Sequence, residues 1–180
     1  MAAQRCAGSG RPPSERPAGK ETPVPKLKPG DRAPAFSLMD QHGKMVKLSD
    51  FEGKKLLLYF YPKADTPGCT KQACNVRDHR QDLTTLGVAA VGISPDSPEK
   101  QLKFDQKYGL GFPLLSDEDH EVASAYGVWA EKTRFGKTQM GITRSSFLVD
   151  EGGRILRAWY GIKPDQTAPE AEKALGGGQE

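Results

Sequence analysis

Residues 59–74 read YFYPKADTPGCTKQAC, and this stretch decides how the rest of the chain is organised. It begins within an unbroken apolar run, residues 56–61, which is typical of a strand covered on both faces. Pro62 has no N–H group to donate to a neighbouring strand, so the strand should end there. Thr66 and Pro67 then favour the start of a helix, with a hydroxyl as its N-cap and a proline at its first position.

Cys69 falls in the first turn of this predicted helix. Backbone N–H groups without helical partners and the positive end of the helix dipole both face a side chain in that turn. Such surroundings stabilise a thiolate, so Cys69 should lose its proton more readily than a free cysteine does. The location therefore favours a reactive cysteine over a buried structural thiol.

Pro62, Thr66 and Cys69 match the pattern P-x-x-x-T-x-x-C, which resembles the active-site signature of the peroxiredoxins. Cys74, five residues after Cys69, narrows the resemblance to the atypical two-cysteine group called peroxiredoxin Q or bacterioferritin comigratory protein. The resemblance covers roughly residues 26–160. Outside the main block it is carried by residues 92–94, 97–100, 112–120, 126–129 and 144–150.

This resemblance implies a thiol peroxidase that needs no metal, flavin or haem cofactor. Cys69 would attack the O–O bond of hydrogen peroxide or an organic hydroperoxide and become a sulfenic acid. Cys74 would then form an intramolecular disulfide with Cys69, and a thioredoxin-type dithiol would reduce it. Thr66 would bond the thiolate or the peroxide, Pro62 would limit access of water, and Arg144 would favour the thiolate and orient the peroxide. Relatives are often monomers, so a monomer is expected.

Each of these residues also has a simpler interpretation. Thr66 and Pro62 could serve only as a helix cap and a strand stop. Arg144 comes just before a predicted strand, where arginines usually lie on the surface. Cys74 could be a small residue on the helix face that packs against the core.

Three other interpretations of the two cysteines compete with a peroxidase. A peroxide-responsive redox sensor or holdase-like binding module would use the same cysteines without significant turnover. A general disulfide oxidoreductase is disfavoured, because such enzymes typically carry C-x-x-C. A zinc site on the two cysteines needs two more ligands, and His42, His79 and His120 stand isolated in the sequence.

Length, charge and cysteine content limit the remaining classes. The 180 residues suffice for one domain with a core, and a net charge of +3 is too small to indicate nucleic-acid binding. Tyr126, Trp129 and Phe135 are expected to pack within the protein rather than stack on bases. No apolar run approaches the length of a membrane span. Three cysteines are too few for a disulfide-stapled secreted module, which favours a reducing cytoplasm.

Hydrophobic runs and turn residues predict an α/β domain with three layers, a central mixed sheet and an added N-terminal hairpin. This order of elements fits the thioredoxin-like fold that the resemblance also implies. The predicted strands are residues 35–38, 45–48, 56–61, 88–94, 112–115, 145–149 and 154–160. The predicted helices are residues 67–86, 98–108 and 119–126, with a weak helix at 169–175.

Residues 26–175 are predicted to form this domain. Residues 1–25 are rich in Pro, Gly, Ser and Arg, and they are predicted to be a disordered tail because they bury too little apolar surface to offset the entropy of ordering. A transit peptide is the alternative for the tail, although its prolines disfavour an amphipathic helix. Cys6 lies in the tail as a spare thiol, and residues 176–180 are predicted to be loose.

Cys69 and Cys74 should be unable to form a disulfide within a regular helix. Five helical residues separate two Cα atoms by about 8–9 Å, whereas a disulfide needs less than about 7 Å. We therefore expect both cysteines in one helix in the reduced protein. In the oxidised protein we expect local unwinding from residue 66 to about residue 76.

Overall fold

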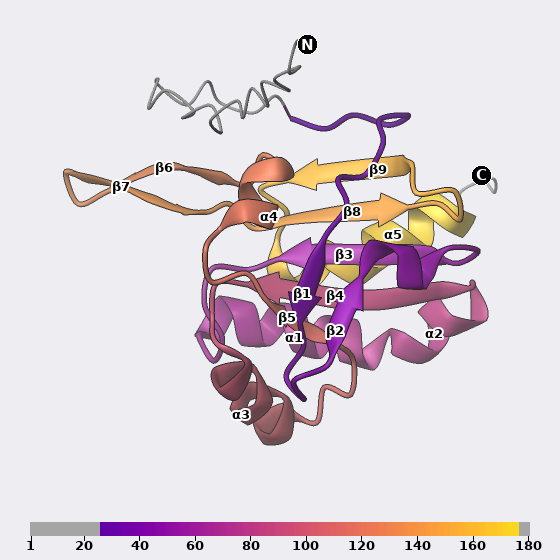
Figure 1. The fold of residues 1–180 in the computed structure, drawn as a ribbon, viewed down its shortest axis with the longest axis horizontal. Helices are drawn as coiled ribbons and strands as arrows, with labels where there is room; N and C mark the ends of the chain where they lie inside the picture. The colour runs from indigo at the N-terminus through magenta and orange to yellow at the C-terminus, as the bar shows by residue number, and fades with distance from the viewer. Residues whose placement is uncertain (1–25, 177–180) are drawn as a thin grey trace, which may run out of the picture.

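Strand β3 (Lys55–Phe60) is an inner strand of a seven-stranded sheet in the computed structural model of the protein, which describes residues 26–176 (Figure 1). It pairs in parallel with β4 (Val88–Ser94) and antiparallel with β8 (Ser145–Val149). The other strands are β1 (Ser37–Met39), β2 (Met45–Lys47), β5 (Leu114–Ser116) and β9 (Ile155–Tyr160), in the order β2-β1-β5-β4-β3-β8-β9. The predicted mixed sheet is confirmed.

Side chains of β3 alternate between two buried faces, as the unbroken apolar run predicts. Leu58 and Phe60 enter a cluster that includes side chains of α4 (Glu121–Ala125) and packs against η1 (Leu48–Phe51). Leu57 and Tyr59 face the opposite side of the sheet. That side is covered by α1 (Pro67–Asp78), α2 (Arg80–Thr85), α3 (Pro98–Tyr108) and α5 (Thr167–Gly176), the last preceded by η2 (Pro164–Gln166).

These layers confirm the predicted thioredoxin-like three-layer fold with its N-terminal hairpin. β1 and β2 form the hairpin, in which Leu38 lies opposite Val46. β1 also pairs with β5, so the hairpin extends the central sheet. Among residues 26–176, no helix has both the length and the apolar character needed to cross a membrane.

The predicted helix over residues 67–86 is wrong as a single element, because it is divided at His79 into α1 and α2. The His79 backbone leaves the helical region (φ −90°, ψ 1°), and its side chain lies 2.7 Å from the Glu172 carboxylate on α5. The division changes which residues face the core. Leu83 is buried, whereas Leu86 is 37% exposed.

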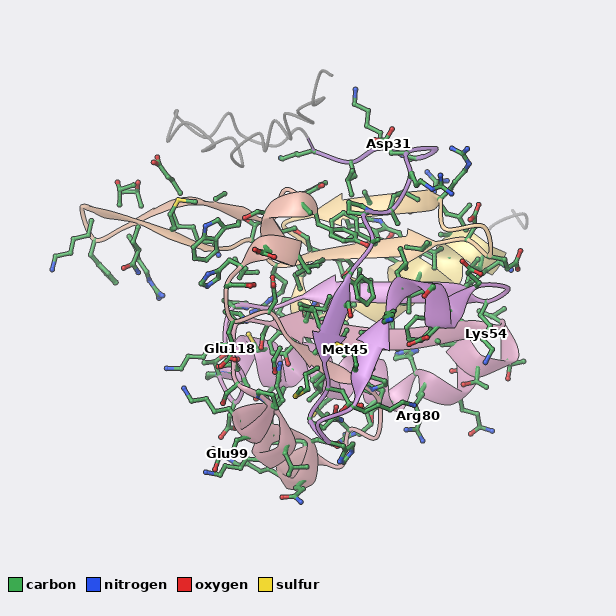
Figure 2. All side chains as sticks on the ribbon, in the orientation of Figure 1. Asp31, Met45, Lys54, Arg80, Glu99 and Glu118 are labelled. Carbon is green, nitrogen blue, oxygen red and sulfur yellow. The ribbon has the colours of Figure 1, made fainter. Side chains whose placement is uncertain are left out.

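A second hairpin, β6 (Trp129–Arg134) and β7 (Lys137–Ile142), was not predicted. It extends beyond the body of the protein, with most of its side chains exposed (Figure 1 and Figure 2). Phe135 and Gly136 form its two-residue turn with φ of 53° and 75°, the positive values that hairpin turns favour. A strand exposed on both faces has no apolar alternation to reveal it.

The aromatic residues are only partly placed as expected. Tyr126 is buried, and Trp129 is half-buried with its ring stacked on His120 at 3.8 Å. Phe135 is 93% exposed at the hairpin turn, so the expectation that it packs is wrong. Physically, the two-residue turn holds its ring away from every layer of the core.

At the C-terminus the helix is longer than predicted, because α5 runs from Thr167 to Gly176. Gly176 is therefore helical rather than loose. The predicted tail at residues 1–25, including Cys6, and residues 177–180 lie outside the described residues. The proposed division of the chain into tail, domain and loose end thus stays a prediction.

Candidate active site

Cys69 is the third residue of α1 and is 1% exposed. Thr66 precedes the helix with extended backbone, and its carbonyl accepts a hydrogen bond from the Thr70 N–H at 2.8 Å. The expected side-chain cap is absent, and the Thr66 hydroxyl donates instead to the Lys63 carbonyl at 2.8 Å. The Thr66 hydroxyl therefore does not compete for the free N–H groups of the first turn, where Cys69 lies.

Arg144 lies beside Cys69, although 75 residues separate them in the sequence. Its Nη2 atom donates to the Cys69 sulfur at 3.3 Å. Arg144 follows β7 and precedes β8, and its carbonyl is held by the Ile162 N–H at 3.0 Å. Among the described residues its buried Nε atom has no hydrogen-bond partner. A guanidinium this close favours a thiolate and retains a donor for a further ligand.

Gly68 makes this approach possible. A Cβ atom at this position would lie 2.9 Å from both Nη1 and Nη2 of Arg144. Real Cβ atoms essentially never show so short a contact, so any larger residue would displace the guanidinium. The sequence pattern alone assigns Gly68 no such function, because the contact depends on a distant residue.

Tyr59 and Tyr61 pack in one buried cluster with Cys69. Burial is the main cause that raises the pKa of both phenols well above the usual value of 10.0, and a charge on Cys69 raises it further. Both tyrosines are therefore neutral at ordinary pH. The Tyr59 hydroxyl is buried and has no hydrogen-bond partner among the described residues.

Cys74 lies on the same helix as Cys69, is half-buried, and both thiols are free. This agrees with the expectation that the reduced protein carries both cysteines in one helix. Since α1 is continuous from Pro67 to Asp78, the sulfur atoms cannot bond without a change of backbone. Pro62 is half-buried two residues after the end of β3, in the loop that leads to Thr66.

Side chains on both sides of Cys74 tie α1 to the C-terminal segment. The Gln72 amide donates to the Thr167 hydroxyl at 3.0 Å, and both side chains belong to buried residues. The Asn75 side-chain oxygen accepts from the Ala168 N–H at 3.2 Å. Together with the contact between His79 and Glu172, these bonds hold the C-terminal half of α1 against α5.

The cysteines do not lie in a group of side chains close enough to share a metal ion. Within residues 26–176, the group that meets this condition consists of His79, Asp82 and Glu172, whose ligand atoms lie within 4.8 Å of one another. The expectation that His79 is isolated is therefore wrong, since α5 brings Glu172 to it. The group contains no sulfur ligand.

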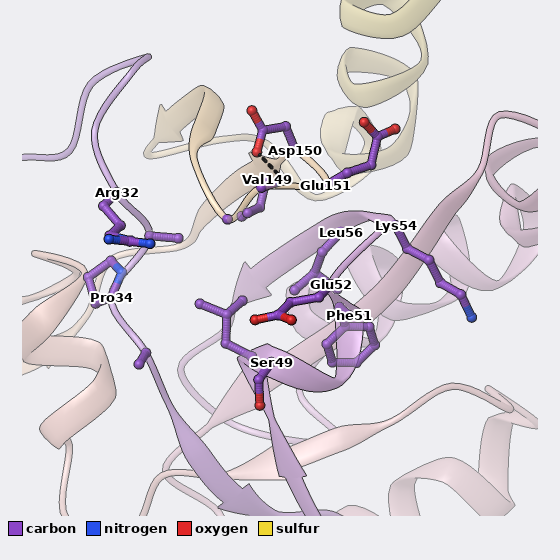
Figure 3. Close-up of a pocket in the computed structure, with 15 residues that line it drawn as sticks. Arg32, Pro34, Ser49, Phe51, Glu52, Lys54, Leu56, Val149, Asp150 and Glu151 are labelled. Atoms are coloured by element: carbon purple, nitrogen blue, oxygen red, sulfur yellow. Dashed lines mark hydrogen bonds between the residues drawn. The ribbon is translucent and has the colours of Figure 1, made fainter.

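A pocket of about 400 Å³ lies at the opposite end of the sheet (Figure 3). Leu56, at the start of β3, and Val149, at the end of β8, line it together with Arg32, Glu52 and other residues. Cys69 follows the other end of β3, so this pocket is separate from the cysteine site.

A family model described as the AhpC/TSA family matches residues 29–158. A match of this extent covers Cys69, Cys74, Arg144 and all strands of the sheet except the last two residues of β9. The chain therefore belongs to the AhpC/TSA family, and it is a peroxiredoxin, an enzyme that reduces peroxides with a cysteine thiol.

Individual relatives place the chain more narrowly, among proteins of the Bcp or peroxiredoxin Q type. Peroxiredoxin Bcp of Escherichia coli strain K12 is 57% identical over 137 residues, which are 76% of this chain and 88% of that protein. The crystal structure of peroxidoxin BcpB from Mycobacterium tuberculosis has a TM-score of 0.76 and 35% identity, and the match covers 86% of this chain and 99% of that chain.

A further solved structure carries a description of its activity. Bacterioferritin comigratory protein of Xanthomonas campestris, whose structures are described as giving insights into its alkyl peroxide reduction activity, is 33% identical with a TM-score of 0.75. The match covers 79% of this chain and 90% of that chain.

Proposed function

We propose that this protein reduces hydrogen peroxide and organic hydroperoxides with the Cys69 thiolate as the nucleophile. The observation that carries the proposal is the contact of Arg144 with the Cys69 sulfur at the start of a helix. The sulfur attacks the terminal oxygen of the peroxide, an S–O bond forms and the O–O bond breaks. Cys69 becomes a sulfenic acid, and the leaving alkoxide or hydroxide takes a proton to give an alcohol or water.

Arg144 and Thr66 hold the peroxide in this proposal. The unpaired Nε of Arg144 donates to a peroxide oxygen, while Nη2 stays on the sulfur. The Thr66 hydroxyl already donates to Lys63, so its remaining lone pairs accept the peroxide O–H. Pro62, in the loop between β3 and α1, shields the thiolate from water.

Cys74 resolves the sulfenic acid in this scheme. Its thiol attacks the Cys69 sulfur, a disulfide forms within the chain and water leaves. A thioredoxin-type dithiol then reduces the disulfide and restores both thiols. Because the disulfide is internal, a monomer can complete the cycle. The need for a dithiol reductant favours a reducing cytoplasm as the compartment in which the enzyme acts. The alkyl peroxide activity described for the Xanthomonas relative supports organic hydroperoxides as substrates.

The test is steady-state consumption of NADPH with thioredoxin, thioredoxin reductase and either peroxide. Wild-type protein should turn over, Cys69→Ser should not, and Cys6→Ser should match the wild type, because Cys69 is the proposed nucleophile and Cys6 has no part in the scheme. A single stoichiometric burst without turnover by any reductant would instead support the redox sensor. Cys69→Ser with near-normal turnover would remove the proposed nucleophile.

A further inference from the structure

The β6–β7 hairpin leads directly into the cysteine site. Ile142 ends β7, and Arg144 follows two residues later with its guanidinium on Cys69. Within the hairpin, Trp129 lies opposite Ile142 and Lys132 lies opposite Gln139. Any side chain of β6 that reaches along the hairpin toward Ile142 therefore approaches the site.

Lys132 makes that reach. Its ammonium donates to the Ile142 carbonyl, so the side chain crosses from its own strand to the end of β7. Gly141 leaves room for the crossing, since a Cβ atom there would lie 3.2 Å from the Lys132 Cδ and 3.7 Å from its Cε. Lys132 takes part in none of the ion pairs found among residues 26–176. Its charge is therefore not neutralised by a neighbouring carboxylate in that part of the chain.

We propose that Lys132 is a positioning residue of the peroxidase site, a second cation that works with Arg144 to stabilise negative charge on the Cys69 sulfur. The ammonium acts through space and through the end of β7, whose next residues carry the guanidinium. The proposal adds a second cation to the arginine that the resemblance already implied. It also assigns a function to the exposed β6–β7 hairpin.

The electrostatic surroundings of both groups agree with this assignment. Burial and the neighbouring charge of Arg144 lower the pKa of Lys132, and negative charge on Cys69 opposes that shift. The other titratable groups that face Cys69 are Tyr59 and Tyr61, with burial-raised pKa values that leave them neutral. In this proposal two cations lie near a thiolate at Cys69: the Arg144 guanidinium in contact with the sulfur, and the Lys132 ammonium, which is bonded to the carbonyl of Ile142, two residues before Arg144.

The effect should appear in the pH dependence of Cys69 reactivity. Removal of a cation that does not touch the sulfur should move the midpoint of the curve upward by about 0.5 to 1 pH unit. Below the midpoint, the rate should fall about threefold to tenfold. Because Lys132 is only partly buried, the difference should shrink as salt is raised.

The experiment measures alkylation of Cys69 by iodoacetamide in the full chain, followed by peptide mass spectrometry across a range of pH. Lys132→Gln should shift the midpoint upward, and Lys132→Arg should restore it, because arginine keeps the charge. Lys132→Met is a second neutral variant that keeps the apolar stem over Gly141, in case glutamine disturbs the hairpin. Lys137→Gln, at the far end of the same hairpin, is the control with an equal change of net charge.

Superimposed curves for the wild type and both neutral variants would overturn the proposal. So would a shift by Lys137→Gln as large as that by Lys132→Gln, or a failure of Lys132→Arg to restore the midpoint. The proposal rests on the proposed function in taking Cys69 as the reacting thiol. Alkylation is measured without peroxide, so the two proposals fail in different ways. Unchanged alkylation curves for the Lys132 variants would overturn the function of Lys132. A Cys69→Ser variant that keeps peroxidase turnover would overturn the proposed function.

Discussion

Replacement of Thr167 by valine tests whether α1 must leave α5 when the cysteines bond. The Thr167 hydroxyl accepts the hydrogen bond of the Gln72 amide, and both residues are 0% exposed. The Gln72 side-chain oxygen already has no partner among the described residues. Valine has nearly the same shape as threonine but no hydroxyl, so it leaves the whole Gln72 amide buried without a hydrogen bond.

The expected change in reduction potential depends on which redox state retains the hydrogen bond between Gln72 and Thr167. In the reduced protein, an unsatisfied buried polar group costs about 1–3 kcal/mol. In the oxidised protein, unwinding of residues 66–76 transfers the Gln72 amide to water, so the substitution has little effect there. The disulfide is therefore favoured by the same 1–3 kcal/mol. For this two-electron couple, the reduction potential should become about 20–65 mV more negative.

The assay equilibrates wild-type and variant protein with a dithiol/disulfide buffer, traps free thiols and counts them by mass spectrometry. Amide hydrogen exchange on both states follows the unwinding, and protection at residues 72–76 should fall on oxidation and return with dithiothreitol. Thr85→Val is the matched control, because the Thr85 hydroxyl donates to the Gln81 carbonyl at an exposed site on α2.

The reasoning would be refuted by two results. The first is a potential unchanged from the wild type while peptide mapping shows the bond between Cys69 and Cys74. The second is equal protection of residues 72–76 in the two states. Either result would mean that the disulfide forms without release of Gln72 from Thr167.

Three further predictions concern the site and its support. Gly68→Ala should slow the reaction with peroxide at least about tenfold, measured by stopped-flow fluorescence, because the added Cβ displaces the Arg144 guanidinium; an unchanged rate would contradict the geometry. Hydrogen bonds from Lys107 and Tyr108 lower the pKa of Asp65 in the folded protein. The ionised Asp65 side chain therefore stabilises the fold above the usual carboxyl pKa of 3.8, and this stabilisation is lost as the pH falls through the lowered pKa of the folded state. Asp65→Asn, which keeps the positive φ of 59°, should lower the melting temperature slightly at pH 7 and not in acid, and high salt should remove the difference. Phe147→Ala should reduce the free energy of unfolding in urea by about 3–5 kcal/mol, because this 0% exposed ring packs between other aromatic rings; a loss below about 1 kcal/mol would contradict that packing.

The block at residues 59–74 could be interpreted from the sequence because its rules are local. An apolar run, a proline that stops it and a proline that begins a helix each act within a few residues, and the structure has β3 and α1 at those places. The position of Cys69 in the first turn follows from the same rules. The mixed sheet and the order of its flanking helices were also predictable, since buried strands read as continuous apolar runs.

Contacts between distant segments were decided only by the tertiary structure. Arg144 approaches Cys69 because the segment between β7 and β8, which carries Arg144, lies next to the start of α1. The approach also requires a glycine at position 68, which leaves room for the guanidinium. Sequence spacing carries no information about such an approach, so Arg144 was predicted from family resemblance alone.

The same limit explains the division at His79 and the β6–β7 hairpin. At the division, His79 contacts Glu172, 93 residues later in the chain. Helix propensities describe neighbouring residues and cannot predict a contact between residues so far apart. The hairpin exposes both of its faces, so its strands lack the alternation that marks a half-buried strand. Local propensity and hydrophobic pattern thus determined the scaffold and the position of the nucleophile, whereas the charges around the nucleophile were set by chain segments that meet only after folding.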